Sequence, residues 1–230
     1  MLGLPDGITA CLFDLDGVLT KTATVHARAW KQVFDAYLRE QGDERPFDAR
    51  DDYDAYVDGK PRAAGVRDFL ASRGLHPSDE EIERLADVKN DHMLELISTE
   101  GVEAYPGSVR YLEAARDAGL RRAVVSSSHN CRDVLVAAGI EHLLEERVDG
   151  TVADARHLQG KPQPDTFLEG ARRLGVEPAQ AAVYEDALAG VAAGRAGAFG
   201  RVIGVDRAGQ RDALREHGAD VVVEDLEELL

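Results

Sequence analysis

Two aspartates separated by one residue are the side chains of this chain best suited to chemistry. Asp14 and Asp16 follow the short apolar run Ala10–Phe13 and precede Gly17. Such a run is typical of a buried strand, whose alternate residues point to the same side, so we expect both carboxylates to face one spot. Gly17 permits a sharp turn and a close approach to the backbone. The alternative interpretation is a strand that ends in a turn with solvated aspartates.

Three later segments also carry polar side chains where apolar runs end. Ser126–Asn130 precedes a predicted helix and suits a phosphate, although serine-rich helix caps are common as well. Lys161, one of only five lysines, lies in a turn with two prolines, where a solvated loop lysine is the alternative. Glu185 and Asp186 end a third run, and acidic residues also favour a helix start. If all four carboxylates share one rim, their charge calls for a hard divalent cation such as Mg²⁺.

The elements that must position these side chains fall into two parts. Residues 22–103 show a helical pattern, whereas short apolar strands alternate with helices from Tyr105 onward. We expect strands at 8–16, 122–126, 151–153, 181–184, 201–205 and 220–223. The alternation predicts an α/β fold, a doubly wound (Rossmann-like) parallel sheet with an α-helical cap domain inserted after strand 1. We expect the core to comprise residues 1–20 and 105–230 and the cap residues 21–104.

The composition excludes several classes of partner. A net charge of −16 argues against nucleic acid and against an anionic membrane, because both require basic patches. Cys11 and Cys131 are too few for a disulfide framework. Asp6 and Asp14 interrupt the N-terminal region, which predicts no signal peptide, and no apolar stretch approaches the ~20 residues of a membrane span. We therefore expect a cytoplasmic protein that acts on a small molecule, and nothing demands more than a monomer.

The helical insertion places one basic residue on the apolar face of each of three predicted helices. These residues are His26, Arg62 and Lys89. Each has an ordinary explanation by itself, since long basic stems lie along apolar surfaces and a core histidine often satisfies a neighbour. Together they predict a cationic surface that grips the anionic end of a substrate.

The four motifs, in this order, resemble the haloacid dehalogenase-like superfamily of phosphoryl-transfer enzymes. The likeness covers essentially the whole chain, and within the superfamily the chain is most similar to the β-phosphoglucomutase-like group. The matching segments are 13–20 (Phe-Asp-Leu-Asp-Gly-Val-Leu-Thr), 26–30 (His-Ala-Arg-Ala-Trp), 89–91 (Lys-Asn-Asp), 105–107 (Tyr-Pro-Gly) and 161–165 (Lys-Pro-Gln-Pro-Asp).

The resemblance implies a role for each core motif. Asp14 would be the nucleophile that carries the phosphoryl group, and Asp16 the general acid and base. The Asp14 carboxylate, the Asp16 backbone carbonyl and Asp186 would hold Mg²⁺, with support from Glu185. A cation on one carboxylate but not the other is a physical way to separate two pKa values. Ser126 and Lys161 would bind the phosphoryl oxygens, with Ser127 and Asn130 as neighbouring ligands.

The resemblance also implies a substrate. His26 would orient the general acid, while Thr22, Arg62 and Lys89 would contact the substrate. The implied activity is the interconversion of β-glucose 1-phosphate and glucose 6-phosphate through a bisphosphate, with cap closure excluding water.

A sugar-phosphate phosphatase with the same core is the main alternative, because the chemistry is identical until the acceptor enters. Two departures from the group's pattern keep it open: Lys21 stands where an acidic residue is usual, and His129 where a lysine is common. A phosphonate-cleaving enzyme would need a Schiff-base lysine, for which Lys60 and Lys89 are available. A signalling receiver is disfavoured by the Asp-x-Asp spacing and the long insertion, and a dehalogenase has no obvious task for Asp16.

Overall fold

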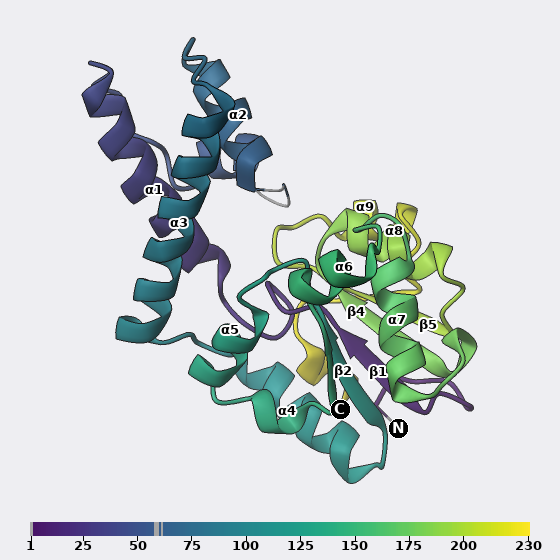
Figure 1. Cartoon of the computed structure of the whole chain (residues 1–230). Coiled ribbons are helices and arrows are strands. Elements are labelled where there is room, and N and C mark those ends of the chain that lie inside the picture. The colour runs from purple at the N-terminus through teal and green to yellow at the C-terminus, as the bar shows by residue number, and fades with distance from the viewer. Residues whose placement is uncertain (1, 58–59, 61) are drawn as a thin grey trace. The chain divides into compact units, whose positions relative to one another are not determined.

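The computed structural model describes residues 2–57, 60 and 62–230, and the chain forms two compact units (Figure 1). A sheet unit comprises the chain up to Lys21 together with Val102–Leu230, and a helical unit comprises Thr22–Gly101. Lys21 belongs to the sheet unit because its backbone N–H donates to the Glu103 carbonyl at 2.9 Å. The insertion thus leaves and re-enters the sheet unit at neighbouring points.

The sheet unit contains a six-stranded parallel sheet, which confirms the predicted α/β fold. In the described residues its strands are β1 (Ala10–Phe13), β2 (Arg121–Val125), β3 (Glu146–Val148), β4 (Ala181–Glu185), β5 (Arg201–Val205) and β6 (Val221–Val223). Their order is β3-β2-β1-β4-β5-β6, with every pair parallel. Phe13 pairs with Val124 on one side and with Tyr184 on the other. This register brings the carboxyl ends of β1, β2 and β4 to one level.

Helices cover both faces of the sheet, as Figure 1 shows. Leu12 faces α7 and the residues around it, whereas Phe13 faces α4, where it meets the ring of Tyr111 edge-on. Strands buried on both faces are typical of parallel sheets. The helices of this unit are α4 (Pro106–Asp117), α5 (Cys131–Ala137), α6 (Gly150–Arg156), α7 (Asp165–Leu174), α8 (Leu188–Ala196) and α9 (Arg211–Glu216).

One predicted strand is wrong. Residues 151–153 lie in α6 rather than in the sheet, because the Asp149 side chain accepts a hydrogen bond from Val152 N–H at 3.0 Å and begins a helix. The strand at this edge is instead β3, three residues long. Its half-buried Glu146 and Arg147 conceal it from a search for apolar runs. Charged residues are common on edge strands because they discourage pairing with other chains.

The helical unit has a core of its own. Its elements are α1 (Ala23–Glu40), a π-helical turn (Tyr53–Val57), α2 (Arg62–Ser72) and α3 (Asp79–Glu100). Phe34 lies at the centre, with its ring 4.2 Å from that of Phe69 and 4.9 Å from that of Trp30. Ser78 caps α3 by accepting from Glu81 N–H. Among the described residues, no helix combines the length and apolar character that a membrane crossing requires.

Candidate active site

Asp14 and Asp16 occupy the turn that directly follows β1. Asp14 is buried, and its N–H donates to the Tyr184 carbonyl at 2.9 Å, which continues the pairing with β4 by one residue. Leu15 is fully buried, whereas Asp16 is half-buried. The turn is tight because Gly17 N–H donates to the Thr20 carbonyl at 2.9 Å. The two aspartates are close enough for the charge of Asp16 to contribute to the raised pKa of Asp14.

Glu185 and Asp186 end β4 beside this turn. A Cβ atom on Gly17, whose φ is +81°, would lie 1.9 Å from Oδ2 of Asp186. Glycine at this position is therefore required both by the backbone conformation and by the proximity of a carboxylate. Glu185 is buried, and its Oε2 accepts from Ala187 N–H at 2.7 Å. Gly190 of α8 makes room for it, since a Cβ there would lie 1.8 Å from Oε1 of Glu185.

Lys161 bridges the ends of three strands. Its ammonium group contacts the carboxylates of both Asp14 and Glu185 and lies 3.4 Å from the Val125 carbonyl at the end of β2. The aromatic ring of Phe167 lies beneath it, with the centroid 5.0 Å from Nζ. The side chain of Lys161 is 10 % exposed, so Lys161 is not a solvated loop lysine, which was the alternative interpretation of the sequence.

The electrostatics of this cluster show more negative charge than Lys161 balances. Burial raises the pKa of Asp14 to about 8, with Glu185 and Asp16 adding to the rise and Lys161 opposing it. The pKa of Asp186 is likewise raised well above its usual range, first by burial and then by Glu185 and Asp14. Burial opposes the charge on Lys161, but Asp14 and Glu185 outweigh that effect and raise its pKa.

These carboxylates fit a hard divalent cation, which prefers oxygen ligands and would relieve their mutual repulsion. Within the described ranges, no three Asp, Glu, His or Cys side chains are grouped as ready-made metal ligands. A cation at Asp14 and Asp186 would therefore draw further ligands from backbone, water or substrate oxygens, as Mg²⁺ commonly does.

The loop Ser126–Asn130 follows β2 at the same edge of the sheet. Ser126 is buried, its N–H donates to the Val148 carbonyl at 2.9 Å, and its Oγ accepts from Ser128 N–H at 3.1 Å. Ser127 is exposed and Asn130 is half-buried. The Ser126 hydroxyl is therefore bonded within its own turn and does not cap α5, which begins at Cys131. Ser126 lies one residue beyond the carbonyl that Lys161 approaches.

In the helical unit, the structure brings His26 and Lys89 together. Nζ of Lys89, which is 3 % exposed, lies 2.9 Å from Nδ1 of His26 and 5.2 Å from the centroid of the Trp30 ring. Burial, together with the charges of Lys89 and Arg62, lowers the pKa of His26 to about 3. His26 is therefore neutral at physiological pH, with Nδ1 as the acceptor and the proton on Nε2. Thr22 is buried, and its carbonyl accepts from His26 N–H at 2.9 Å.

Arg207, in the loop after β5, was missed from the sequence. Its Nε donates to the Gly17 carbonyl at 2.8 Å, inside the acidic turn. The two residues are 190 positions apart, and a single arginine in a polar loop carries no signal of such a contact.

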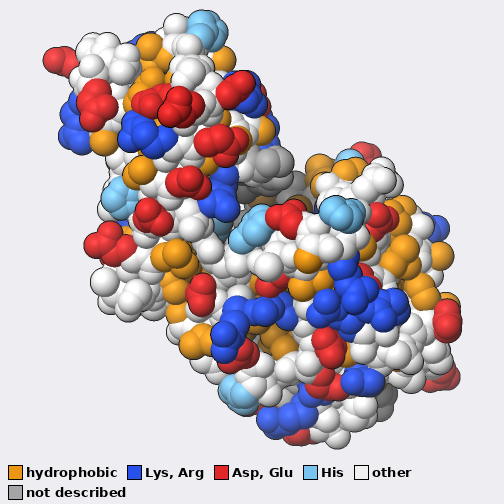
Figure 2. All heavy atoms as spheres, in the orientation of Figure 1, with side chains coloured by type: hydrophobic (Ala, Val, Ile, Leu, Met, Phe, Trp, Pro, Cys, Tyr) orange, Lys and Arg blue, Asp and Glu red, His pale blue; other side chains and the backbone are white. Residues whose placement is uncertain are grey.

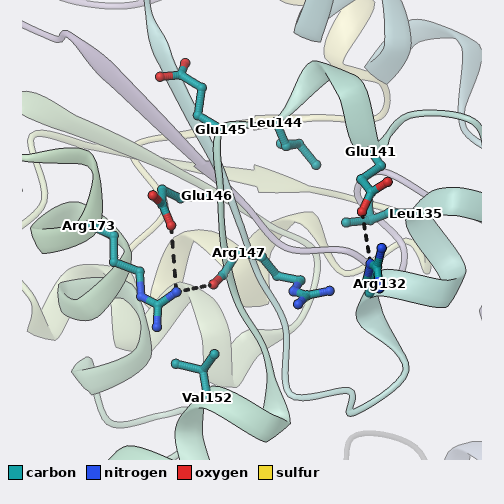
Figure 3. Close-up of a pocket in the computed structure, with 9 residues that line it drawn as sticks. All are labelled: Arg132, Leu135, Glu141, Leu144, Glu145, Glu146, Arg147, Val152 and Arg173. Carbon is teal, nitrogen blue, oxygen red and sulfur yellow. Dashed lines mark hydrogen bonds and ion pairs between the residues drawn. The ribbon is translucent and has the colours of Figure 1, made fainter.

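One pocket of the sheet unit lies apart from this cluster. It measures about 290 Å³ and is drawn in Figure 3. Arg132 pairs with Glu141 at 3.3 Å, and Arg173 with Glu146 at 3.7 Å, so these guanidinium groups already have carboxylate partners. None of the residues predicted as site residues lines it.

A gathering of Lys and Arg side chains over α6 and α7, visible in Figure 2, has a similar explanation. Three arginines surround the buried carboxylate of Glu169: Arg156 at 3.3 Å, Arg172 at 2.6 Å and Arg173 at 2.8 Å. This group balances an internal charge and lies outside the acidic turn.

Comparisons with known proteins agree with the motifs. The family model described as haloacid dehalogenase-like hydrolase matches residues 8–197. A β-phosphoglucomutase of Mycobacterium tuberculosis is 52% identical over 100% of this chain and 94% of its own length. Hexitol phosphatase A of Escherichia coli is 31% identical over 95% of this chain and 91% of its own length.

Solved structures show the same likeness. The crystal structure of a β-phosphoglucomutase from Clostridium difficile superimposes with a TM-score of 0.79 at 27% identity, covering 97% of this chain and 93% of that one. The motif order, the parallel sheet and the matched family model agree. The chain belongs to the haloacid dehalogenase-like hydrolase family, in its β-phosphoglucomutase-like group.

Proposed function

We propose that this protein is a Mg²⁺-dependent β-phosphoglucomutase, which interconverts β-glucose 1-phosphate and glucose 6-phosphate through β-glucose 1,6-bisphosphate. The observation that carries the proposal is the contact of one buried lysine, Lys161, with both Asp14 and Glu185 where three strands end. The 52% identity with a β-phosphoglucomutase supports the choice of substrate.

In the first half-reaction, a carboxylate oxygen of Asp14 attacks the phosphorus of the bisphosphate. The bond from phosphorus to the sugar oxygen breaks, and Asp16 gives its proton to that oxygen. Lys161 and Ser126 would hold the phosphoryl oxygens on which charge is spread. Ser127 and Asn130 would add ligands from the same loop. The product is an aspartyl phosphate on Asp14 and a sugar monophosphate.

In the second half-reaction, the free hydroxyl of a sugar monophosphate attacks the aspartyl phosphate. Asp16, now a carboxylate, takes the proton of that hydroxyl, and Asp14 is released. His26 would orient Asp16, while Thr22, Arg62 and Lys89 would hold the substrate. Lys89 is buried beside the neutral His26, which suits a contact that excludes water.

Mg²⁺ would be held by the carboxylates of Asp14 and Asp186 and by the backbone carbonyl of Asp16, with Glu185 in support. It supplies positive charge that favours the ionised form of Asp14, whose pKa burial raises to about 8. Asp16, outside that set of side-chain ligands, would keep the proton that the leaving oxygen requires.

A sugar-phosphate phosphatase is the second candidate, and one contact favours it. His129 stands at a position where a lysine is common in the group. Its Nε2 lies 2.8 Å from Oδ2 of Asp154, so its ring is directed at α6. The 31% identity with hexitol phosphatase A is consistent with this alternative.

The test is an assay with β-glucose 1-phosphate, Mg²⁺ and a catalytic amount of the bisphosphate, in which glucose 6-phosphate and free phosphate are measured separately. A mutase yields glucose 6-phosphate, whereas a phosphatase yields free phosphate without it. Asp16→Ala should abolish both activities, because both need the same proton carrier; retained turnover would contradict the role of Asp16.

A further inference from the structure

Three backbone segments meet beside the acidic turn of the sheet unit. The first is the turn itself, from Asp16 to Lys21, and the second is the returning segment that ends at Tyr105. Tyr105 N–H donates to the Leu19 carbonyl at 3.0 Å, which ties the second segment to the first. The third follows β6, at Glu224 and Asp225. In the part of the chain that the structure describes, no backbone–backbone hydrogen bond links the third segment to the turn.

Arg207 makes that connection. Its Nε donates to the Gly17 carbonyl at 2.8 Å, and one terminal nitrogen donates to the Glu224 carbonyl at 2.6 Å. The guanidinium lies over the Tyr105 ring, with its carbon atom Cζ 3.6 Å from the ring centroid. Asp225 lies 3.6 Å away and supplies a counter-charge. One side chain, 20 % exposed, thus contacts all three segments.

The loop after β5, which carries Arg207, also contacts the segment of Glu185 and Asp186. Gln210, three residues after Arg207, donates from Nε2 to the Asp186 carbonyl at 3.1 Å. Gly17 and Asp186 have no spare room between them, since a Cβ on Gly17 would lie 1.9 Å from Oδ2 of Asp186. A small shift of the Gly17 carbonyl would therefore change the spacing between Asp16 and Asp186.

We propose that Arg207 is a positioning residue that fixes the Asp16–Gly17 turn relative to Asp186. It acts through the Gly17 backbone and does not itself contact a reacting group. Its effect on rate rests on the proposed phosphoryl transfer, whereas its effect on the turn does not. Reactions of this kind depend on alignment, and a misplacement of about 1 Å can cost on the order of 100-fold in rate.

The chemistry of the side chain fits this role better than a purely stabilising one. A guanidinium presents several donors in a planar fork and stacks on an aromatic face, which an ammonium group cannot do in the same way. One terminal nitrogen of Arg207 is buried and has no hydrogen-bond partner in the described part of the chain. Leaving a buried donor unpaired is unfavourable. The site thus retains an arginine whose Nε and Nη1 donate to Gly17 and Glu224 and whose Nη2 has no hydrogen-bond partner among the described residues.

The experiment compares three variants: Arg207→Met, Arg207→Lys and the matched control Arg211→Met. Arg211 also donates to a backbone carbonyl of the segment around β6, that of Val222 at 2.7 Å, and pairs with the Glu224 carboxylate. Neither of these two bonds involves the turn. The first measurement is hydrogen exchange of the peptide Asp14–Thr20. Its amides at Gly17, Leu19 and Thr20 donate to carbonyls within the turn at 2.9 Å, so exchange reports opening of the turn.

We expect this peptide to exchange at least about fivefold faster in both Arg207 variants than in Arg211→Met. In the sugar-phosphate assay, kcat should fall at least about tenfold in both, with KM within about threefold of the wild type. If Arg207 only stabilised the fold, its replacement would lower the melting temperature without a fall in kcat at nearly constant KM. If Arg207→Met fails to fold, Arg207→Lys carries the same comparison, because it keeps the charge and loses the fork.

Two results would overturn the inference. One is an exchange rate of the turn that is the same in the Arg207 variants as in Arg211→Met. The other is full rescue by Arg207→Lys, which would show that charge alone matters. If the wild type does not convert β-glucose 1-phosphate, the proposed function fails, and the exchange comparison still decides the role of Arg207.

Discussion

The ammonium group of Lys161 contacts the carboxylate of Asp14 at the end of β1. Both side chains are 10 % exposed, and the pair is completed by Glu185. Attraction between buried opposite charges is strong, but so is the penalty for leaving one of them alone. Lys161 therefore serves the fold as well as the proposed chemistry.

Lys161→Met should lower both activity and stability. It leaves Asp14 and Glu185 without their cation, so we expect kcat/KM to fall at least about 100-fold. The free energy of unfolding at neutral pH should fall by about 3 kcal/mol, as measured by urea denaturation. The control is Lys60→Met, since the Lys60–Asp68 pair has side chains 37% and 48% exposed. That variant should change the free energy of unfolding by no more than about 1 kcal/mol. Equal losses of stability in Lys161→Met and Lys60→Met would contradict the stabilising role of Lys161.

Gly17→Ala should inactivate the enzyme, whereas Gly7→Ala should not. Both glycines have positive φ values, +81° and +93°, so both variants share the cost of an L side chain in that conformation, about 1 kcal/mol. Gly7 has open space around it, but a Cβ on Gly17 would displace the Asp186 carboxylate. Activity and melting temperature of the two variants check this. Wild-type kcat in Gly17→Ala would show that the close approach to Asp186 has no role.

Such contacts mark the limit of what the sequence predicts. The Asp-x-Asp spacing and the apolar runs predict which strand ends meet, because the carboxyl ends of parallel strands lie on one edge. They also predict His26 and Lys89 on apolar helix faces. They do not predict Arg207, whose partner lies 190 residues away and is a backbone carbonyl. Nor do they predict β3, because the charges of Glu146 and Arg147 hide a short edge strand.

Glu169 should contribute stability that acid removes. The guanidinium of Arg172, with help from Arg173 and Arg156, holds its pKa down at about 2, against 4.5 as the ordinary value. The stabilisation is therefore fully present above about pH 4.5 and is lost as the pH falls toward 2, because the unfolded chain then binds the proton first. We expect Glu169→Gln to lose about 2 kcal/mol at pH 7. Urea denaturation at several pH values should show the difference from wild type shrinking below pH 4.5; a constant difference would contradict it.

His26 should remain neutral in mildly acidic solution. Burial, with the charges of Lys89 and Arg62, lowers its pKa to about 3, whereas the ordinary value is 6.5. Between these values the unfolded chain binds a proton that the folded chain does not, so the stability from this group decreases as the pH falls through that window. Imidazole NMR signals should report the Nε2-protonated neutral form at pH 5. A titration centred near pH 6.5 would show that burial and the charges of Lys89 and Arg62 do not lower the pKa of His26.

In the proposed reaction, the phosphoryl group on Asp14 passes to a sugar hydroxyl rather than to water. A phosphorus NMR time course with β-glucose 1-phosphate, Mg²⁺ and a trace of the bisphosphate distinguishes the two acceptors. We expect the C1-phosphate signal to be replaced by a C6-phosphate signal, with little inorganic phosphate. Inorganic phosphate appearing at the rate of substrate loss, without the C6-phosphate signal, would contradict it.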